Sequence, residues 1–148
     1  MNKKKKVSEL SRDFKFEFVT EAPLEEIINL YKEGNWWKES PTFRAQVPKI
    51  ITGSFAFILV RDSAKKIIGM GRVISDGISD GYIQDLILYK EYRGLGLGQE
   101  MVRLLTKYCQ DRGVWWVGLI AEPGTTGFYE SMGFVALTDH MAMLHKDS

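Results

Sequence analysis

A glycine-rich turn between an apolar run and a long amphipathic stretch constrains this chain more than any other feature. Residues Asp85 to Gln99 read DLILYKEYRGLGLGQ, and a helix is expected from Leu95 or Gly96 onward. That helix has no Ser, Thr, Asp or Asn at its N-cap, so its first N–H groups lack side-chain acceptors. Such donors at the positive end of a helix dipole bind anions, and glycine admits a phosphate closely. The turn therefore predicts a phosphate-bearing ligand.

Two common phosphate-binding patterns do not fit this turn. The Walker type needs a Lys after its last glycine, and no such Lys is present. The dinucleotide pattern G-x-G-x-x-G fails because Gln99 or Met101 stands where its third glycine belongs. The pattern that remains is R-x-x-G-x-G, formed by Arg93, Gly96 and Gly98. Arg93 can add a charge-assisted contact to the same anion.

Length and charge narrow the class of protein. With 148 residues and no internal repeat, we expect a flexible basic tail over residues 1–13 and a single domain over 14–148. The net charge is +1, and the lysines at positions 3–6 form the only basic block, so we expect no nucleic-acid partner. No apolar run is long enough to span a bilayer, and we expect no association with a membrane. The single Cys109 fits a reducing cytoplasm, where we expect the protein to lie.

Hydrophobic periodicity predicts an α/β fold, a mixed sheet of six to seven strands with helices on both faces. The stretch from Val114 is wholly apolar, as expected of a strand buried on both faces. The predicted strands are Phe14–Thr20, Phe55–Arg61, Lys66–Ser75, Tyr82–Tyr89, Val114–Ala121 and a last pair within Phe134–His145. The predicted helices are Glu21–Gly34, Phe43–Ile51, the helix ending at Asp111, and Thr125–Met132.

Several of these motifs together resemble one superfamily. The R-x-x-G-x-G turn resembles the pyrophosphate-binding motif of the GCN5-related N-acetyltransferase (GNAT) superfamily, usually written Q/R-x-x-G-x-G/A. The segment Gly127–Phe134, GFYESMGF, is similar to the F-Y-x-x-x-G-F segment of that family. The stretches Gly69–Gly77 and Ile83–Leu86 resemble small members that acetylate amines. The resemblance extends from Phe14 to the C-terminus.

The resemblance implies the acyl-CoA N-acyltransferase fold, in which a bulge splays the fourth strand from the fifth. It further implies acetyl-CoA as a co-substrate, with its pantetheine arm lying in that gap, and no metal. One departure is that Glu122 stands where many members place an asparagine against the pantetheine. The implied cofactor-binding residues are Leu86, Ile87, Leu88, Arg93, Gly94, Leu95, Gly96, Leu97, Gly98 and Gln99.

The family chemistry also assigns catalytic groups. Tyr129 matches the tyrosine that protonates the departing CoA thiolate. The backbone N–H of Leu88 is a candidate donor to the oxyanion of the tetrahedral intermediate. The attacking amine must lose a proton, and Asp85 is the first candidate to accept it because burial among apolar residues can raise a carboxyl pKa. Asp85 can equally be a structural carboxylate. His140 is a second candidate, because imidazole titrates near neutral pH, and Glu39 and Asp76 are further candidates.

We expect the acceptor pocket beside the segment between the first two helices. In this fold, that segment covers the pocket. Trp36 and Trp37 are adjacent there, and neighbouring side chains of an extended backbone point opposite ways. One indole can therefore line the pocket and hold a cation over its face, with Glu39 attracting an ammonium. The leading hypothesis is acetylation of a small primary amine. A peptide or lysine acceptor, a non-catalytic acyl-CoA sensor, and a homodimer are left open.

Overall fold

The computed structural model describes residues 13–148, and the predicted basic tail lies outside the described residues except for Asp13. The chain divides into two compact units, one ending at Gly118 and one covering Leu119–Ser148. Among residues 13–148, no helix combines the length and apolar character needed to cross a membrane.

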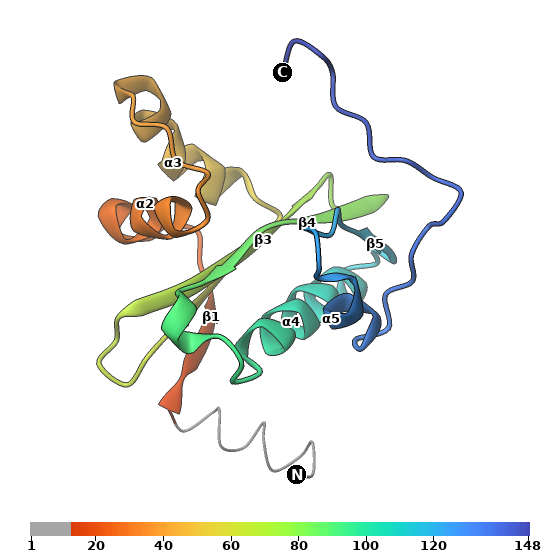
Figure 1. The fold of residues 1–148 in the computed structure, drawn as a ribbon. Coiled ribbons are helices and arrows are strands. Elements are labelled where there is room, and N and C mark those ends of the chain that lie inside the picture. Colours follow the sequence, from red (N-terminus) through yellow and green to blue (C-terminus); the bar gives the residue numbers. More distant parts are fainter. Residues whose placement is uncertain (1–12) are drawn as a thin grey trace. The chain divides into compact units, whose positions relative to one another are not determined.

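The first unit is built on a five-stranded mixed sheet (Figure 1). Its strands are β1 (Lys15–Phe18), β2 (Ala56–Arg61), β3 (Ile67–Ser75), β4 (Asp80–Leu88) and β5 (Trp116–Gly118). They stand in the sheet in chain order, with the first four antiparallel to their neighbours and β5 parallel to β4. The mixed α/β class predicted from the sequence is confirmed.

Helices cover both faces of this sheet, with α2 (Leu24–Glu33) and α3 (Pro41–Gly53) on one side and α4 (Leu97–Asp111) on the other (Figure 1). Glu25 and Glu26 occupy the first turn of α2, where their carboxylates interact favourably with the positive end of the helix dipole. At the start of α3, the Ser40 hydroxyl accepts a hydrogen bond of 2.9 Å from the Phe43 N–H. This side-chain cap satisfies one of the free donors of the helix.

Two apolar layers fix the helices on the sheet. The layer under α2 and α3 consists of Ile27, Ile28, Leu30, Tyr31, Val47, Ile51, Phe57, Leu59, Ile67 and Met70. On α4 the buried side chains are Leu97, Met101, Val102, Leu105 and Cys109, a stripe at helical spacing. Burying a side chain of this size stabilises the fold by about 1.5–3 kcal/mol. Ile87, near the end of β4, packs against the first layer, and Gly81, near its start, lies close to Cys109 of α4.

Two predictions about strands are wrong. The sheet has five strands rather than six or seven, because Phe134–His145 forms no strand in the second unit. Its described backbone hydrogen bonds are local turns, such as His140 N–H to the Leu137 carbonyl at 3.0 Å. The second correction concerns β5, which is an edge strand among the described residues. Trp115, just before β5, and Trp116, its first residue, are exposed, so the expected burial on both faces does not occur.

Candidate functional site

A bulge lies in the middle of β4. Met70 of β3 pairs with Ile87, but Arg72, two residues on, pairs with Gln84, so β4 carries one extra residue. Asp85 lies in this step with φ +56°, the left-handed region that Asp enters more readily than most residues. Gly71 faces the bulge, and a Cβ there would lie only 2.7 Å from a methyl carbon of Leu86. A side chain at position 71 would therefore force Leu86 to move.

After its first three residues, β4 has an open edge in the first unit. β5 pairs only with Asp80, Gly81 and Tyr82, the first three residues of β4. We call the remainder, Ile83–Leu88, the open half of β4. A strand edge without a neighbour presents backbone donors and acceptors that an extended ligand can bind.

The open half of β4 leads directly into the predicted glycine turn. A short 3-10 helix, η1 (Lys90–Tyr92), is followed by Gly94 with φ +81° and Gly96 with φ +88°. Gly96 is the N-cap of α4 and provides no side-chain cap, as the sequence predicts, and the helix begins at Leu97 rather than at Leu95 or Gly96. The first N–H groups of α4 are consequently available to an anion.

The Arg93 side chain fastens this loop to its surroundings. Its Nε donates to the Leu88 carbonyl at 3.1 Å, and a terminal nitrogen lies 3.6 Å from a Glu33 carboxylate oxygen. The same oxygen of Glu33 accepts from the Lys90 N–H at 3.1 Å. The guanidinium is half-exposed, and its contact with a pyrophosphate stays a prediction. Glu33 is a residue that the sequence analysis did not single out.

The Asp85 carboxylate accepts hydrogen bonds from two side chains on the α2 side of the sheet. Its Oδ2 accepts from the Tyr31 hydroxyl at 2.9 Å and from Arg72 Nε at 2.7 Å. Arg72 also donates to the Gln84 side chain at 3.0 Å. Burial, together with the Asp85 charge, raises the pKa of Tyr31, so its phenol stays protonated and donates. These contacts support the structural role that the sequence left open for Asp85, and its catalytic role stays a prediction.

Sequence reasoning missed both partners of Asp85. Arg72 follows a buried apolar stretch of β3, and a guanidinium in such surroundings needs a counter-charge. This need for a counter-charge is the sequence signal that could have identified the pairing of Arg72 with Asp85. Tyr31 stands at helical spacing with apolar residues, where its ring belongs to the core and its hydroxyl goes unnoticed.

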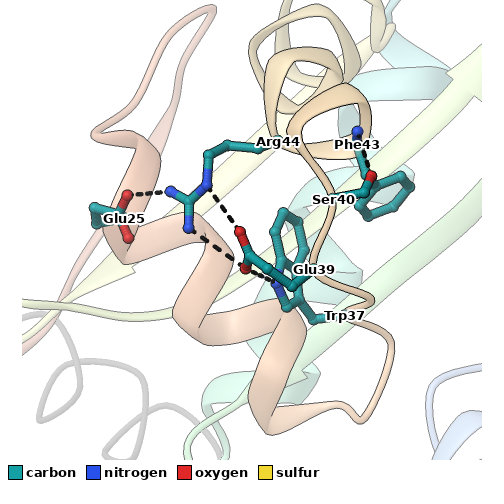
Figure 2. Close-up of polar contacts among 6 residues, drawn as sticks. All are labelled: Glu25, Trp37, Glu39, Ser40, Phe43 and Arg44. Atoms are coloured by element: carbon teal, nitrogen blue, oxygen red, sulfur yellow. Dashed lines mark hydrogen bonds and ion pairs between the residues drawn. The ribbon is translucent and has the colours of Figure 1, made fainter.

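The predicted acceptor segment connects α2 to α3, and Figure 2 shows its polar contacts. The Trp37 indole N–H donates to Glu39 at 2.7 Å, and Arg44 Nε donates to the other Glu39 oxygen at 3.2 Å. Arg44 also pairs with Glu25. The bond from Trp37, followed by that from Arg44, lowers the pKa of Glu39. Glu39 is therefore ionised at neutral pH, but Arg44 already pairs with its charge.

The two tryptophans differ in their surroundings. Trp37 is half-buried, packs against the core, and has its ring 5.1 Å from that of Phe43. Trp36 remains 37% exposed, with its ring edge-on to Tyr31 at 6.5 Å. Because Tyr31 also bonds Asp85, the exposed indole and the bulge carboxylate contact the same side chain. Trp36 is thus the more exposed of the two indoles.

The second unit carries the remaining predicted residues. Tyr129 lies on its short helix α5 (Thr126–Glu130), with its ring 5.0 Å from Phe128 and 5.8 Å from Phe134. Burial raises the pKa of the Tyr129 phenol, and the Glu122 carboxylate adds to the rise. His140 is exposed in a turn. Within residues 13–148, no group of three or more His, Cys, Asp or Glu side chains could hold a metal ion.

Comparisons with known proteins agree with this geometry. The sequence matches the Acetyltransferase (GNAT) family over residues 8–134. It is 27% identical over 114 residues to an uncharacterized N-acetyltransferase of Porphyra purpurea, covering 73% of this chain and 66% of the relative. It is 35% identical over 63 residues to glucosamine 6-phosphate N-acetyltransferase 1 of Oryza sativa subsp. japonica, covering 43% of this chain and 38% of the relative.

A solved structure shows the same fold. The GNAT family acetyltransferase of Streptococcus pneumoniae superposes with a TM-score of 0.74 at 23% identity, covering 90% of this chain and 98% of its own. A splayed mixed sheet with a glycine turn at the end of its fourth strand defines an acyl-CoA N-acyltransferase fold. The chain belongs to the GNAT acetyltransferase family.

Proposed function

We propose that this protein transfers the acetyl group of acetyl-CoA to a primary amine of a small molecule. The observation that carries the proposal is the continuity of two features. The open half of β4 presents an unpaired strand edge, and it leads directly into a glycine N-cap with free N–H groups. An extended arm that ends in a pyrophosphate matches this combination, because its amides fit a strand edge and its phosphates a helix N-terminus.

The proposed reaction is a direct attack. The neutral amine nitrogen forms a bond to the thioester carbonyl carbon, and the resulting oxyanion accepts a hydrogen bond from the Leu88 N–H. The carbon–sulfur bond then breaks, and the thiolate takes a proton from the Tyr129 hydroxyl. The amine nitrogen loses its proton to Asp85, directly or through water. The products are an N-acetylated amine and CoA thiol.

Two observations support a small amine as acceptor. A relative that matches the chain in part is a glucosamine 6-phosphate N-acetyltransferase, whose acceptor is a small amine. In addition, the exposed Trp36 ring and the Asp85 carboxylate contact the same Tyr31 side chain, and an indole face attracts cations. An ammonium is the form in which a primary amine reaches the protein at neutral pH.

A panel assay tests the proposal. CoA release is measured with acetyl-CoA and a set of small amines, including aryl-alkyl amines and amino sugars, and with lysine peptides as the competing acceptor class. We expect turnover with at least one small amine and weaker turnover with peptides. Turnover with peptides alone would assign the protein to lysine acetylation. Tight acetyl-CoA binding without any turnover would make it a sensor.

A further inference from the structure

We propose that Tyr31 and Glu33, on the last turn of α2, are positioning residues that hold the open half of β4 in place for acetyl transfer. The inference rests on the proposed function, which assigns that edge to acetyl-CoA. Neither side chain has to touch acetyl-CoA or the amine. Tyr31 acts through the Asp85 side chain at the bulge, and Glu33 acts through the backbone of the turn that follows β4.

The open half of β4 needs external support. It is bonded to β3 on one side, while its other edge must stay free for an extended ligand. It also contains Asp85 at φ +56°, a conformation that persists only where the surroundings enforce it. A bulged strand with one free edge has fewer restraints than a central strand and opens locally more easily.

The last turn of α2 supplies that support at two points. Tyr31 is only 4% exposed, and its hydroxyl donates to the Asp85 carboxylate at the bulge. Glu33 accepts from the Lys90 N–H, two residues past the end of β4, and lies near the Arg93 guanidinium. One helix end therefore fixes the strand at its bulge and at its exit into the glycine turn.

The same helix end also supports the acceptor side. The Trp36 N–H donates to the Tyr31 carbonyl at 2.9 Å, and the Trp36 ring covers Gly34, where a Cβ would lie 2.7 Å from the indole. The indole is thus fixed to the turn that carries Tyr31 and Glu33. Loosening this turn changes the geometry of the amine relative to the thioester, which lowers turnover more than it lowers binding.

A pair of glutamates on α2 offers a matched test. Glu26 accepts from the Ile67 N–H at 3.1 Å, at the start of β3, whereas Glu33 accepts from the Lys90 N–H at the same distance. We compare Glu33→Ala with Glu26→Ala, measuring amide hydrogen exchange without any ligand. Glu33→Ala should speed exchange across residues 84–90 by about 3- to 10-fold, the worth of one hydrogen bond. Glu26→Ala should leave that segment within about twofold.

Kinetics separate positioning from general stability. Glu33→Ala and Tyr31→Phe should each lower kcat by about 3- to 10-fold while the KM for acetyl-CoA changes less. Glu33→Gln keeps an oxygen for the Lys90 N–H and should restore most of the loss. Equal exchange in Glu33→Ala and Glu26→Ala, or unchanged exchange at residues 84–90, would overturn the inference. A wild-type protein without turnover would instead overturn the proposed function, because the exchange experiment needs no substrate.

Discussion

The Tyr31 hydroxyl donates a hydrogen bond of 2.9 Å to the carboxylate of Asp85, a residue 54 positions further along the chain. The bond joins α2, which leads into the acceptor segment, to the bulge of β4. A contact at this sequence separation forms only after the helix has packed on the sheet. The Tyr31 phenol, protonated because its pKa is raised, can only donate to Asp85, so the carboxylate accepts from both Tyr31 and Arg72.

Replacing Gly94 by Glu should abolish acetyl-CoA binding. The new carboxylate would stand in the turn that we assign to the pyrophosphate. Gly113, at the opposite end of α4, is a matched control, because both glycines have φ near +81° and open space around an added Cβ. Both variants should lose about 1–2 kcal/mol of stability from left-handed strain. Thermal shift with acetyl-CoA should vanish in Gly94→Glu and survive in Gly113→Glu. Equal shifts would place the phosphate site elsewhere.

Tyr129→Phe tests the proposed acid. The change keeps the ring and its contacts with Phe128 and Phe134 and removes only the proton donor. Turnover should fall by on the order of 10², the usual worth of a positioned acid, while the Kd of acetyl-CoA stays within a few fold. Tyr108→Phe, at the end of α4, serves as the control and should keep full turnover. Full turnover in Tyr129→Phe would show that this residue serves only in packing.

The pH profile should show the raised pKa of Tyr129. An acid must be protonated to act, and burial raises the phenol pKa above its usual value of 10.0. The amine must lose its proton, so kcat/KM should rise with pH throughout the neutral range. We expect no alkaline decline below about pH 10 in profiles of kcat/KM. A decline centred near pH 8 would show that a different group supplies the proton.

Asp85→Asn separates the two roles of this residue. Asn is nearly isosteric and, like Asp, tolerates the left-handed backbone of the bulge. If Asp85 accepts the amine proton, turnover should fall by on the order of 10² with acetyl-CoA affinity retained. We expect this result. A variant that keeps turnover but loses about 1–3 kcal/mol on urea unfolding would show a purely structural ion pair with Arg72.

The tryptophan pair should respond unequally to truncation. Trp36→Ala removes an exposed ring and should raise the KM of the amine several-fold, with acetyl-CoA affinity unchanged. Trp37→Ala removes a half-buried ring that packs on the core and bonds Glu39, so it should lower the melting temperature. Initial rates over a range of amine concentrations, together with thermal melts, check both results. An unchanged amine KM in both variants would locate the acceptor elsewhere.

Local sequence rules predicted much of this structure. The start of α4 follows from a glycine turn without a capping side chain, and the hairpin of β2 and β3 follows from two apolar runs around a polar turn. The family resemblance predicts a bulge in the fourth strand, but its place at Asp85 follows only from the pairing of β3 with β4.

The failures have a physical cause as well. Val135 and Leu137 alternate as they would on one face of a strand, but alternation does not supply a pairing partner. Tyr31 and Arg72 escaped notice because a side chain's partner is fixed by tertiary contacts rather than by its own neighbours in sequence. Functional residues that belong to no local sequence pattern can therefore be identified only from the three-dimensional fold.

The chain-order arrangement of the sheet has a consequence for how the protein folds. Each strand pairs with its predecessor, and only a short turn separates β2 from β3 and β3 from β4. Contacts between near neighbours form fast, whereas the parallel pairing of β4 with β5 must wait for the whole of α4. We expect the three-stranded meander to assemble first and β5 to join it last. A chain arrested before that step would expose the full edge of β4, where other chains could pair with it and aggregate.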